Sequence, residues 1–486
     1  VFRPNIIISA PSCITALERK TLVEAACVSS AGKVSVIDEP IVSALGAGLS
    51  VDRPHGTMVI DLGAGTTDIM ICSYQYEGRG QSKITPTPLF WDSFYLAGDD
   101  ILRNLVQNLV IEGKNHQSTE IGNITSALTS RIIKMTDEEL KSLPCFDHMV
   151  YHSKIIDICA TFDEEQKRSK KISLASILIH DFFGTDSSMM TYKDRRCRND
   201  FNTQISVPIA QFMMEMLRKN RPSKLYTYDE IFPDIKPADY LLDHFEHHFG
   251  FRLEELQWRY DPKEVADLVK STMEPLLKQL ALVFFAHQCD IIILAGRPTS
   301  LDAITELFIK YVPTSPDRLI RLNDYRVGSW FPTADGQGYF FDQKAIVATG
   351  AMVGYLAGEA KLQGLLIDFS KMIKQMNSTA NYIGIYNSRR QQVPTTSLSP
   401  TNASATLTLS VFPAFLGCKQ LDSTIYQARP LYAIYNHGTS DTFQVRISRF
   451  FHENKELLVL EEATDSEYRN RTSDLELIQQ SLVDDG

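Results

Sequence analysis

The sequence of 486 residues lacks long apolar runs, an excess of positive charge and paired cysteines, and each absence excludes a class of protein. Its longest apolar stretches, such as Ala281–Ala286 and Ile291–Ala295, are far shorter than the ~20 residues of a membrane-spanning helix. The net charge of −10 repels phosphate backbones, which argues against a nucleic-acid partner. The eight cysteines include no CxxC pair, so we expect reduced thiols in a soluble cytoplasmic chain.

Composition and length indicate an ordinary globular protein with more than one domain. Hydrophobic residues make up 44% and charged residues 22% of the chain, which excludes wholesale disorder and a fibrous repeat. At roughly 150 residues per domain, the length corresponds to about three domains. The chain starts with Val1, and a strand-like run at Ile6–Ile8 follows at once, so we expect a fragment of a longer protein.

Short apolar runs alternate with helical stretches in the first part of the chain, which is typical of an α/β layer architecture. We predict strands at 6–8, 34–37 and 58–61 and helices at 16–29 and 39–49. The next predicted strand, Thr67–Ser73, follows Asp61 after a glycine-rich turn that is too short for a crossover helix. These two strands should therefore pair as an antiparallel hairpin over residues 58–73.

The rest of the chain changes character twice more. Residues 112–264 are polar, with charge runs and irregular hydrophobic spacing, which indicates an inserted and largely helical subdomain. The α/β pattern resumes with a long amphipathic helix at 262–286 and an apolar strand at 290–294. Runs of period two beyond residue 364 predict a small β-rich module. The predicted domains are 1–111, 112–264, 265–364 and 365–486.

The strongest chemical signal is the turn Asp61-Leu62-Gly63-Ala64-Gly65-Thr66-Thr67-Asp68, between two predicted strands. Alternate glycines allow a ligand to approach the backbone closely, and successive N–H groups of such a bend can bind phosphate oxygens. The hydroxyls of Thr66 and Thr67 add donors, and Asp61 could hold magnesium, mainly through water. A glycine-rich hairpin with a capping acid is the plain alternative. We favour a phosphate site because so many suitable residues occur together. Its predicted ligand-binding residues are Gly63, Ala64, Gly65, Thr66, Thr67 and Asp68.

Several segments of the first half resemble bacterial MreB in order and spacing. They are Pro11-Ser12, Ile37–Ala44, Met58–Asp68 and Ala97–Asp100. The first half is thus similar to the superfamily of actin, sugar kinases and heat-shock chaperones, which bind ATP. This resemblance implies an actin-like (ribonuclease H-like) ATPase core with ATP and magnesium as its cofactors.

The resemblance also implies roles for individual residues. The acid that matches Glu39 orients the water that attacks the γ-phosphate, and the acid that matches Asp61 serves the metal, so these are the expected catalytic residues. The same resemblance places Gly98 and Asp99 in the nucleotide site. From the residues alone, Glu39 followed by Pro40 indicates only a helix start.

A second motif, Asp290–Ser300, resembles the adenosine-side strand of the superfamily, which ends in two glycines. Here the second glycine is replaced by Arg297, after Gly296 and before Pro298. An arginine can stack on a base or pair with phosphate, but it can also obstruct the backbone. Gly296 and Arg297 are therefore predicted to contact the nucleotide, and the identity of the base stays open.

The second half is similar to the bacterial SrfB family of virulence factors over residues 190–435. The matching segments are Asp194-Arg195, Asp200–Asn202, Gly296–Ser300, Asp324–Pro332 and Lys344–Met352. These motifs are idiosyncratic, which makes chance agreement improbable. The family label itself implies no reaction.

Together the resemblances imply ATP binding with slow, magnesium-dependent hydrolysis that drives a conformational switch. The alternative is a non-catalytic scaffold that keeps the fold without turnover. Small-molecule phosphorylation would need an acceptor pocket with a base, which the sequence does not identify. The insertion and the C-terminal module are the candidate surfaces for protein partners, and self-assembly stays open.

Superfamily members carry an earlier Asp-x-Gly hairpin, which supplies the first phosphate loop and another carboxylate on the metal side. No such segment precedes Val1 in this chain. We expect that an upstream part was removed, rather than that the site decayed. The chain by itself should then bind nucleotide weakly and be inactive.

Three other groups have both a functional and a structural interpretation. His244, His247 and His248 could share a helix face and bind zinc, but a solvated face is the ordinary explanation. A basic cluster could bind phosphate or an acidic partner, but balancing nearby carboxylates is more common. Trp330 and Phe331 could anchor a partner, but a core role is expected. The residues of the basic cluster are Lys193, Arg195, Arg196 and Arg198.

Overall fold

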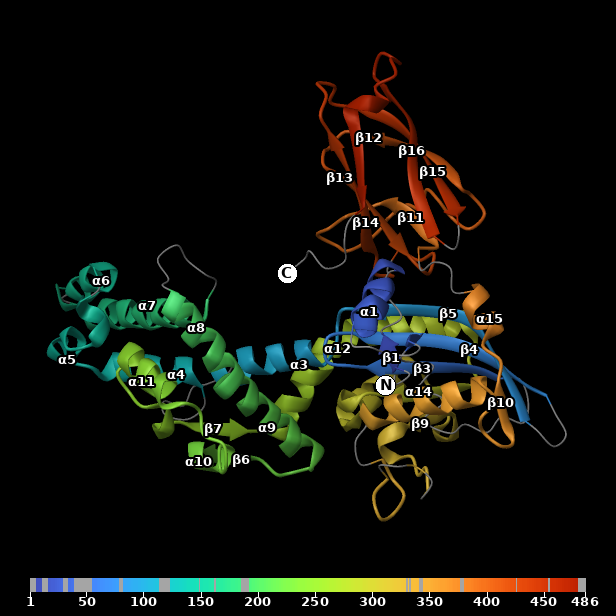
Figure 1. Cartoon of the computed structure of the whole chain (residues 1–486). Helices are drawn as coiled ribbons and strands as arrows, with labels where there is room; N and C mark the ends of the chain where they lie inside the picture. Colours follow the sequence, from blue (N-terminus) through green and yellow to red (C-terminus); the bar gives the residue numbers. More distant parts are fainter. Residues whose placement is uncertain are drawn as a thin grey trace. The chain divides into compact units, whose positions relative to one another are not determined.

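A computed structural model of the chain shows how the elements are arranged (Figure 1). It describes residues 6–10, 16–28, 34–38, 55–77, 82–112, 123–147, 149–160, 163–184, 192–328, 331, 334–340, 344–375, 380–424, 426–452 and 455–479. The chain divides into two compact units. The first unit comprises 1–97, 275–300 and 308–486, and the second comprises 98–274 and 301–307.

A mixed six-stranded sheet is the centre of the first unit, with the strand order β10-β5-β4-β3-β8-β9. Its strands are β3 (His55–Leu62), β4 (Thr67–Glu77), β5 (Ser82–Phe94), β8 (Ile291–Ala295), β9 (Leu319–Arg321) and β10 (Leu365–Ile367). The β3–β4 and β4–β5 pairs are antiparallel, whereas β8 is parallel to β3. The predicted antiparallel hairpin is therefore confirmed, and the chain returns to the same sheet at β8.

Strand β3 lies inside the sheet because its sequence is apolar on both faces. Met58, Val59 and Ile60 are all fully buried, as expected for a central strand that is covered on both sides. Val59 belongs to a core cluster with Phe331 and Ile346 of α14 (Lys344–Gly358). Phe331 is thus a core residue, as expected, whereas Trp330 lies outside the described residues.

A small βαβ unit forms the start of the described chain. Strands β1 (Ile6–Ala10) and β2 (Val34–Asp38) pair in parallel, and α1 (Ala16–Val28) connects them. These elements confirm the predicted strands and the first predicted helix. The second predicted helix, 39–49, lies outside the described residues.

Other helices complete the first unit or join it to the second. They are α12 (Pro262–His287), α13 (Asp302–Tyr311), α15 (Ser370–Gln375) and the 3-10 turns η5 (Arg297–Ser300), η6 (Pro316–Arg318) and η7 (Leu322–Asp324). The long helix expected at 262–286 is confirmed as α12, which runs directly into β8.

The second unit is mainly helical, as expected for the middle of the chain (Figure 1). Its helices are α3 (Gly98–Leu105), η1 (Val106–Ile111), α4 (Ile124–Lys134), α5 (Asp137–Lys141), η2 (Pro144–Asp147), α6 (Met149–Ala160), α7 (Glu164–Phe183), α8 (Tyr192–Phe201), η3 (Asn202–Ser206), α9 (Val207–Arg218), α10 (Tyr228–Ile231), α11 (Asp239–Phe249) and η4 (Leu253–Glu255). One antiparallel pair, β6 (Lys224–Thr227) with β7 (Gln257–Tyr260), was not predicted.

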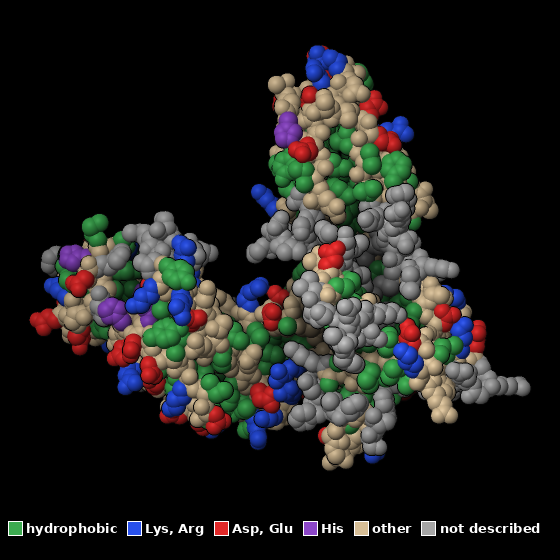
Figure 2. All heavy atoms as spheres, viewed as in Figure 1, with side chains coloured by type: hydrophobic (Ala, Val, Ile, Leu, Met, Phe, Trp, Pro, Cys, Tyr) green, Lys and Arg blue, Asp and Glu red, His purple; other side chains and the backbone are tan. Residues whose placement is uncertain are grey.

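The basic cluster of α8 has structural partners. Arg198 is buried and donates to the backbone carbonyls of Phe182 at 2.8 Å and Asp181 at 3.0 Å. Its guanidinium thereby binds unpaired carbonyls at the end of α7. Arg196 lies 3.5 Å from the carboxylate of Asp200. Figure 2 shows acidic and basic side chains interspersed over the visible face of this unit, which agrees with charge balance.

The three histidines of α11 do not form a metal site in the described part of the chain, where no group of three or more ligating side chains occurs. His244 and His248 instead contact the ring of Phe182, at centroid distances of 5.5 and 5.1 Å. Nε2 of His248 also lies 3.3 Å from the carbonyl oxygen of Leu178. The expectation of a solvated face is therefore wrong for these two histidines and holds for the exposed His247.

The environment of His248 predicts a pH-dependent stability of the helical unit. Burial lowers the pKa of His248 to about 4. Between about pH 6.5 and pH 4 the unfolded chain binds a proton that the folded chain does not, so stability present at neutral pH is lost on acidification, by roughly 3 kcal/mol at most. We expect the urea midpoint, followed by circular dichroism, to fall over this range. His248→Gln should reduce that fall, whereas His247→Gln should not. Equal pH profiles for the two variants would contradict the assignment.

The C-terminal part contains two antiparallel sheets that share one core. One sheet has the order β11-β13-β14-β17 and the other has the order β12-β15-β16. Ile383, Leu416 and Ile434 from the first sheet pack with Phe443 and Val445 from the second. The strands are β11 (Tyr382–Ile385), β12 (Ser404–Leu409), β13 (Ala414–Lys419), β14 (Arg429–Asn436), β15 (Phe443–His452), β16 (Lys455–Asp465) and β17 (Leu475–Gln479), with η8 (Thr472–Asp474) before the last. The expected β-rich C-terminal region is confirmed.

Across the described segments, every helix is too short or too polar to cross a bilayer.

Candidate functional site

The glycine-rich hairpin has a narrow, exposed tip. Asp61 of β3 pairs with Asp68 of β4, and Leu62 pairs with Thr67. The N–H of Gly63 then donates to the carbonyl oxygen of Thr66 at 2.9 Å, which closes the hairpin around residues 64–65. Ala64 and Gly65 are both exposed, so their backbone is accessible to a ligand.

The base of the hairpin is held by buried side chains. Asp68 is 1% exposed and accepts hydrogen bonds from the hydroxyls of Thr66, at 3.0 Å, and Ser93 of β5. The buried hydroxyl of Thr67 donates to the carbonyl oxygen of Leu96 at 2.8 Å. Asp68 therefore fixes the hairpin to β5, and Thr67 fixes it to the segment that follows β5. The exposed tip is the part that can present N–H groups to an anion.

Asp61 lies near the carboxyl end of β3, between two strands. It is 8% exposed and pairs in register with Asp68 on one side and with Ala295 of β8 on the other. Directly paired residues of antiparallel strands share one face, so the carboxyl groups of Asp61 and Asp68 are neighbours at this end of the sheet.

The structure brings the second predicted motif to the same end of the sheet. Gly296 follows β8 directly and has a φ of +87°, and a Cβ atom there would lie 2.0 Å from the carbonyl oxygen of Leu62. The hydroxyl of the buried Thr299 donates to the carbonyl oxygen of Gly296 at 2.7 Å. The side chain of Arg297 is exposed. Ligands of α/β proteins commonly bind where parallel strands end.

Three predicted site residues lie outside the described part of the first unit. Glu39 lies outside the described residues. Gly98 and Asp99 form the first turn of α3, in the second unit, where Gly98 is buried and Asp99 is exposed. An acid in the first turn is favourable for a helix by itself.

Sequence reasoning missed a buried polar cluster on β5. Asp92 is 3% exposed and accepts a hydrogen bond from the hydroxyl of the fully buried Tyr426 at 2.7 Å. Asp92 also forms an ion pair with Arg429 of β14. Burial raises the pKa of Asp92, and the charge of Arg429 opposes that shift. The available signal was an acid in a strand, between Trp91 and Ser93.

Comparison with known proteins first defines the class of the N-terminal segment. A family model of MreB/Mbl proteins matches residues 1–80. The cell shape-determining protein Mbl of Bacillus subtilis is 44% identical over 71 residues, which are 15% of this chain and 21% of that protein. The cell shape-determining protein MreB of Escherichia coli is 39% identical over 70 residues, 14% of this chain and 20% of that protein. The chain thus spans about a fifth of the length of these relatives.

A second family model, described as virulence factor SrfB, matches residues 54–143 and 158–480. These residues are most of the chain, so the protein belongs to the SrfB family, with an MreB-like N-terminal segment. The hairpin 61–68 lies in the region that both family models match.

Proposed function

We propose that this SrfB-family protein binds ATP at the 61–68 hairpin of an actin-like core and hydrolyses it slowly, as a conformational switch. One observation carries the proposal: the Ala64–Gly65 tip is exposed, and the hairpin below it is held by hydrogen bonds of the buried Thr67 and Asp68, next to Asp61. The similarity of residues 1–80 to MreB and Mbl proteins supports it.

The residues of the hairpin fit a magnesium ion that keeps most of its water. Magnesium is usually held by one or two carboxylates together with phosphate oxygens, rather than by a full cage of side chains. Asp61 supplies such a carboxylate, and the described residues contain no cluster of three or more ligating side chains. When bound, the ion would neutralise charge on the phosphates.

The other predicted residues have roles that follow from their positions or from the resemblance. The N–H groups of Ala64 and Gly65 bind phosphate oxygens at the tip. Gly296 and Arg297, at the end of β8, contact the nucleoside side. Glu39 holds and orients the attacking water.

A non-catalytic scaffold is the second candidate, and one observation favours it. The hydroxyl of Thr67 and the carboxylate of Asp68 are both engaged within the fold. A hairpin with these bonds is stable without a ligand, so its conformation alone does not require turnover.

Replacement of Asp61 tests the binding proposal. Asp61→Asn should lower the affinity for ATP with magnesium at least tenfold, because the amide keeps the shape but loses the charge that attracts the cation. Isothermal titration calorimetry measures this change. Asp317→Asn, at an exposed acid, is the matched control and should bind like the unchanged protein.

Hydrolysis is tested separately from binding. In the full-length protein, Glu39→Gln should leave ATP affinity nearly unchanged and abolish the release of phosphate in a single-turnover assay. Binding without any release by the unchanged full-length protein would favour the scaffold. Absence of binding, with equal results for Asp61→Asn, would contradict the whole proposal.

A further inference from the structure

The second unit contains a polar cavity of about 380 Å³, lined by residues of α10, α11 and η4 and of the loops beside them. Cavities of this size commonly bind small molecules. Acidic residues outnumber basic ones in its wall by four to two, so the wall is negatively charged and attracts cations. The acids are Asp229, Asp239, Glu254 and Glu255, and the bases are Lys236 and Arg252.

Both bases of the wall already pair with acids of the wall. Nζ of Lys236 lies 2.9 Å from Oδ1 of Asp229. In the same way, Nη2 of Arg252 lies 2.8 Å from Oε1 of Glu254. Because both cationic groups are engaged, the cavity is poorly suited to an anionic ligand.

Two buried oxygens of the wall lack a hydrogen-bond partner among the described residues. Tyr228 of α10 is 3% exposed, and its hydroxyl is one of them. The other is Oε2 of Glu254, since Arg252 binds only the Oε1 atom of that carboxylate. Buried polar groups are normally bonded, so two unpaired oxygens in one cavity indicate a ligand that donates hydrogen bonds.

The hydroxyl of Tyr228 lies among the acids of the cavity. Burial, together with the negative charges of Glu254, Asp229 and Asp239, raises the pKa of Tyr228 to about 12. The phenol therefore stays neutral at pH 7, and its oxygen can accept a hydrogen bond beside the carboxylate of Glu254.

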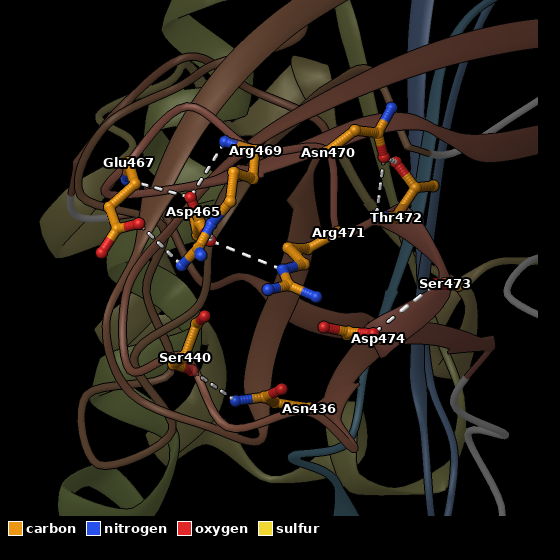
Figure 3. Close-up of polar contacts among 10 residues, drawn as sticks. All are labelled: Asn436, Ser440, Asp465, Glu467, Arg469, Asn470, Arg471, Thr472, Ser473 and Asp474. Carbon is orange, nitrogen blue, oxygen red and sulfur yellow. Dashed lines mark hydrogen bonds and ion pairs between the residues drawn. The ribbon is translucent and has the colours of Figure 1, made fainter.

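Another group of charged side chains, around Asp465 at the end of β16, is satisfied by the chain itself (Figure 3). Asp465 is 4% exposed and accepts hydrogen bonds from the backbone N–H groups of Glu467 and Arg469, at 2.9 and 3.0 Å. Its second oxygen accepts from the guanidinium of Arg469 at 2.9 Å. A ligand would add nothing to this carboxylate, in contrast to that of Glu254.

We propose that the cavity of the second unit binds the primary ammonium group of a small organic cation. Such a group carries three N–H donors. Oε2 of Glu254 and the hydroxyl oxygen of Tyr228 are acceptors for two of them. Pro237 and Leu242, which also line the cavity, offer apolar contact to the carbon chain of the ligand. The described residues contain no group of three or more side chains that could hold a metal ion, so the site suits an ammonium group better than a metal.

Two probes that differ only in their hydrogen-bond donors test this proposal. They are n-butylammonium and n-butyltrimethylammonium, which share one positive charge and one carbon chain. Isothermal titration calorimetry of the whole chain at constant ionic strength should give n-butylammonium a Kd of about 1 mM or lower. The trimethylated probe lacks N–H donors and should bind at least about tenfold more weakly.

Two variants test the assigned oxygens. Tyr228→Phe should weaken the binding of n-butylammonium roughly threefold to tenfold, and Glu254→Gln at least about tenfold. Tyr260→Phe is the matched control, because the hydroxyl of Tyr260 is also buried and unpaired among the described residues but does not line the cavity. It should leave the affinity unchanged. Urea unfolding curves verify that each variant is folded, and n-butylammonium should raise the urea midpoint of the unchanged protein more than that of Glu254→Gln.

Four results would each overturn the proposal. One is the absence of binding up to about 20 mM n-butylammonium. Another is equal affinity for the two probes, which would mean attraction by charge alone. A third is an equal effect of Tyr228→Phe and Tyr260→Phe. The last is binding of a capped lysine at least about tenfold tighter than n-butylammonium, which would assign the cavity to a lysine side chain of another protein.

Discussion

Gly296→Ala is expected to destabilise the first unit by roughly 3–5 kcal/mol. The φ of +87° is unfavourable for a residue with a Cβ atom, and that atom would lie 2.0 Å from the backbone oxygen of Leu62. Neither backbone can move without disturbing the pairing of β8 with β3. Urea unfolding, followed by fluorescence and near-ultraviolet circular dichroism, measures the loss.

Gly65→Ala is the matched control because no atom lies within 4 Å of the added methyl group. It should leave the free energy of unfolding nearly unchanged. Gly296→Ala should also weaken the proposed ATP binding, because the added methyl group would displace Leu62, which belongs to the hairpin. An unchanged urea midpoint for Gly296→Ala would show that β8 does not approach β3 so closely.

The hairpin could be predicted from the sequence because its determinants are local. Apolar runs define β3 and β4, and the turn between them is too short for a crossover. The close approach of Gly296 to Leu62 could not be predicted in this way. It depends on the parallel pairing of β3 with β8, which are more than 200 residues apart. Only the resemblance to the superfamily of actin and sugar kinases predicted that the 61–68 hairpin and the Asp290–Ser300 motif belong to one site.

The sequence also led to an incomplete interpretation of the hairpin's polar residues. Thr67 and Asp68 were predicted as ligand contacts from their types and spacing. The structure shows partners, Leu96 and Ser93, that lie on the next segment of the chain. Residue types indicate hydrogen-bonding capacity, but the partner is set by tertiary packing. For the same reason, the contacts of Asp92 with the C-terminal region could not be foreseen.

Arg429→Met is expected to destabilise the first unit by about 3–5 kcal/mol, because it leaves the buried carboxylate of Asp92 without its cation. The two side chains are 13% and 4% exposed, so water cannot replace the lost charge. Tyr426→Phe removes one neutral donor from the same carboxylate and should cost less, about 1–3 kcal/mol. Arg389→Met, at an exposed arginine, is the control and should be nearly neutral.

The pH dependence distinguishes a lost ion pair from lost packing. Burial already raises the pKa of Asp92, and removal of Arg429 should raise it further. A folded-state pKa above the unfolded value means that the folded chain binds the additional proton, so stability falls as pH rises through that pKa. The difference in stability between Arg429→Met and the unchanged protein should therefore shrink as the pH falls through the raised pKa of Asp92 in the variant. Asp92→Asn combined with Arg429→Met should cost less than the sum of the single changes, because the two residues are directly coupled. A pH-independent difference, with additive costs, would mean that Arg429 stabilises the fold through packing alone.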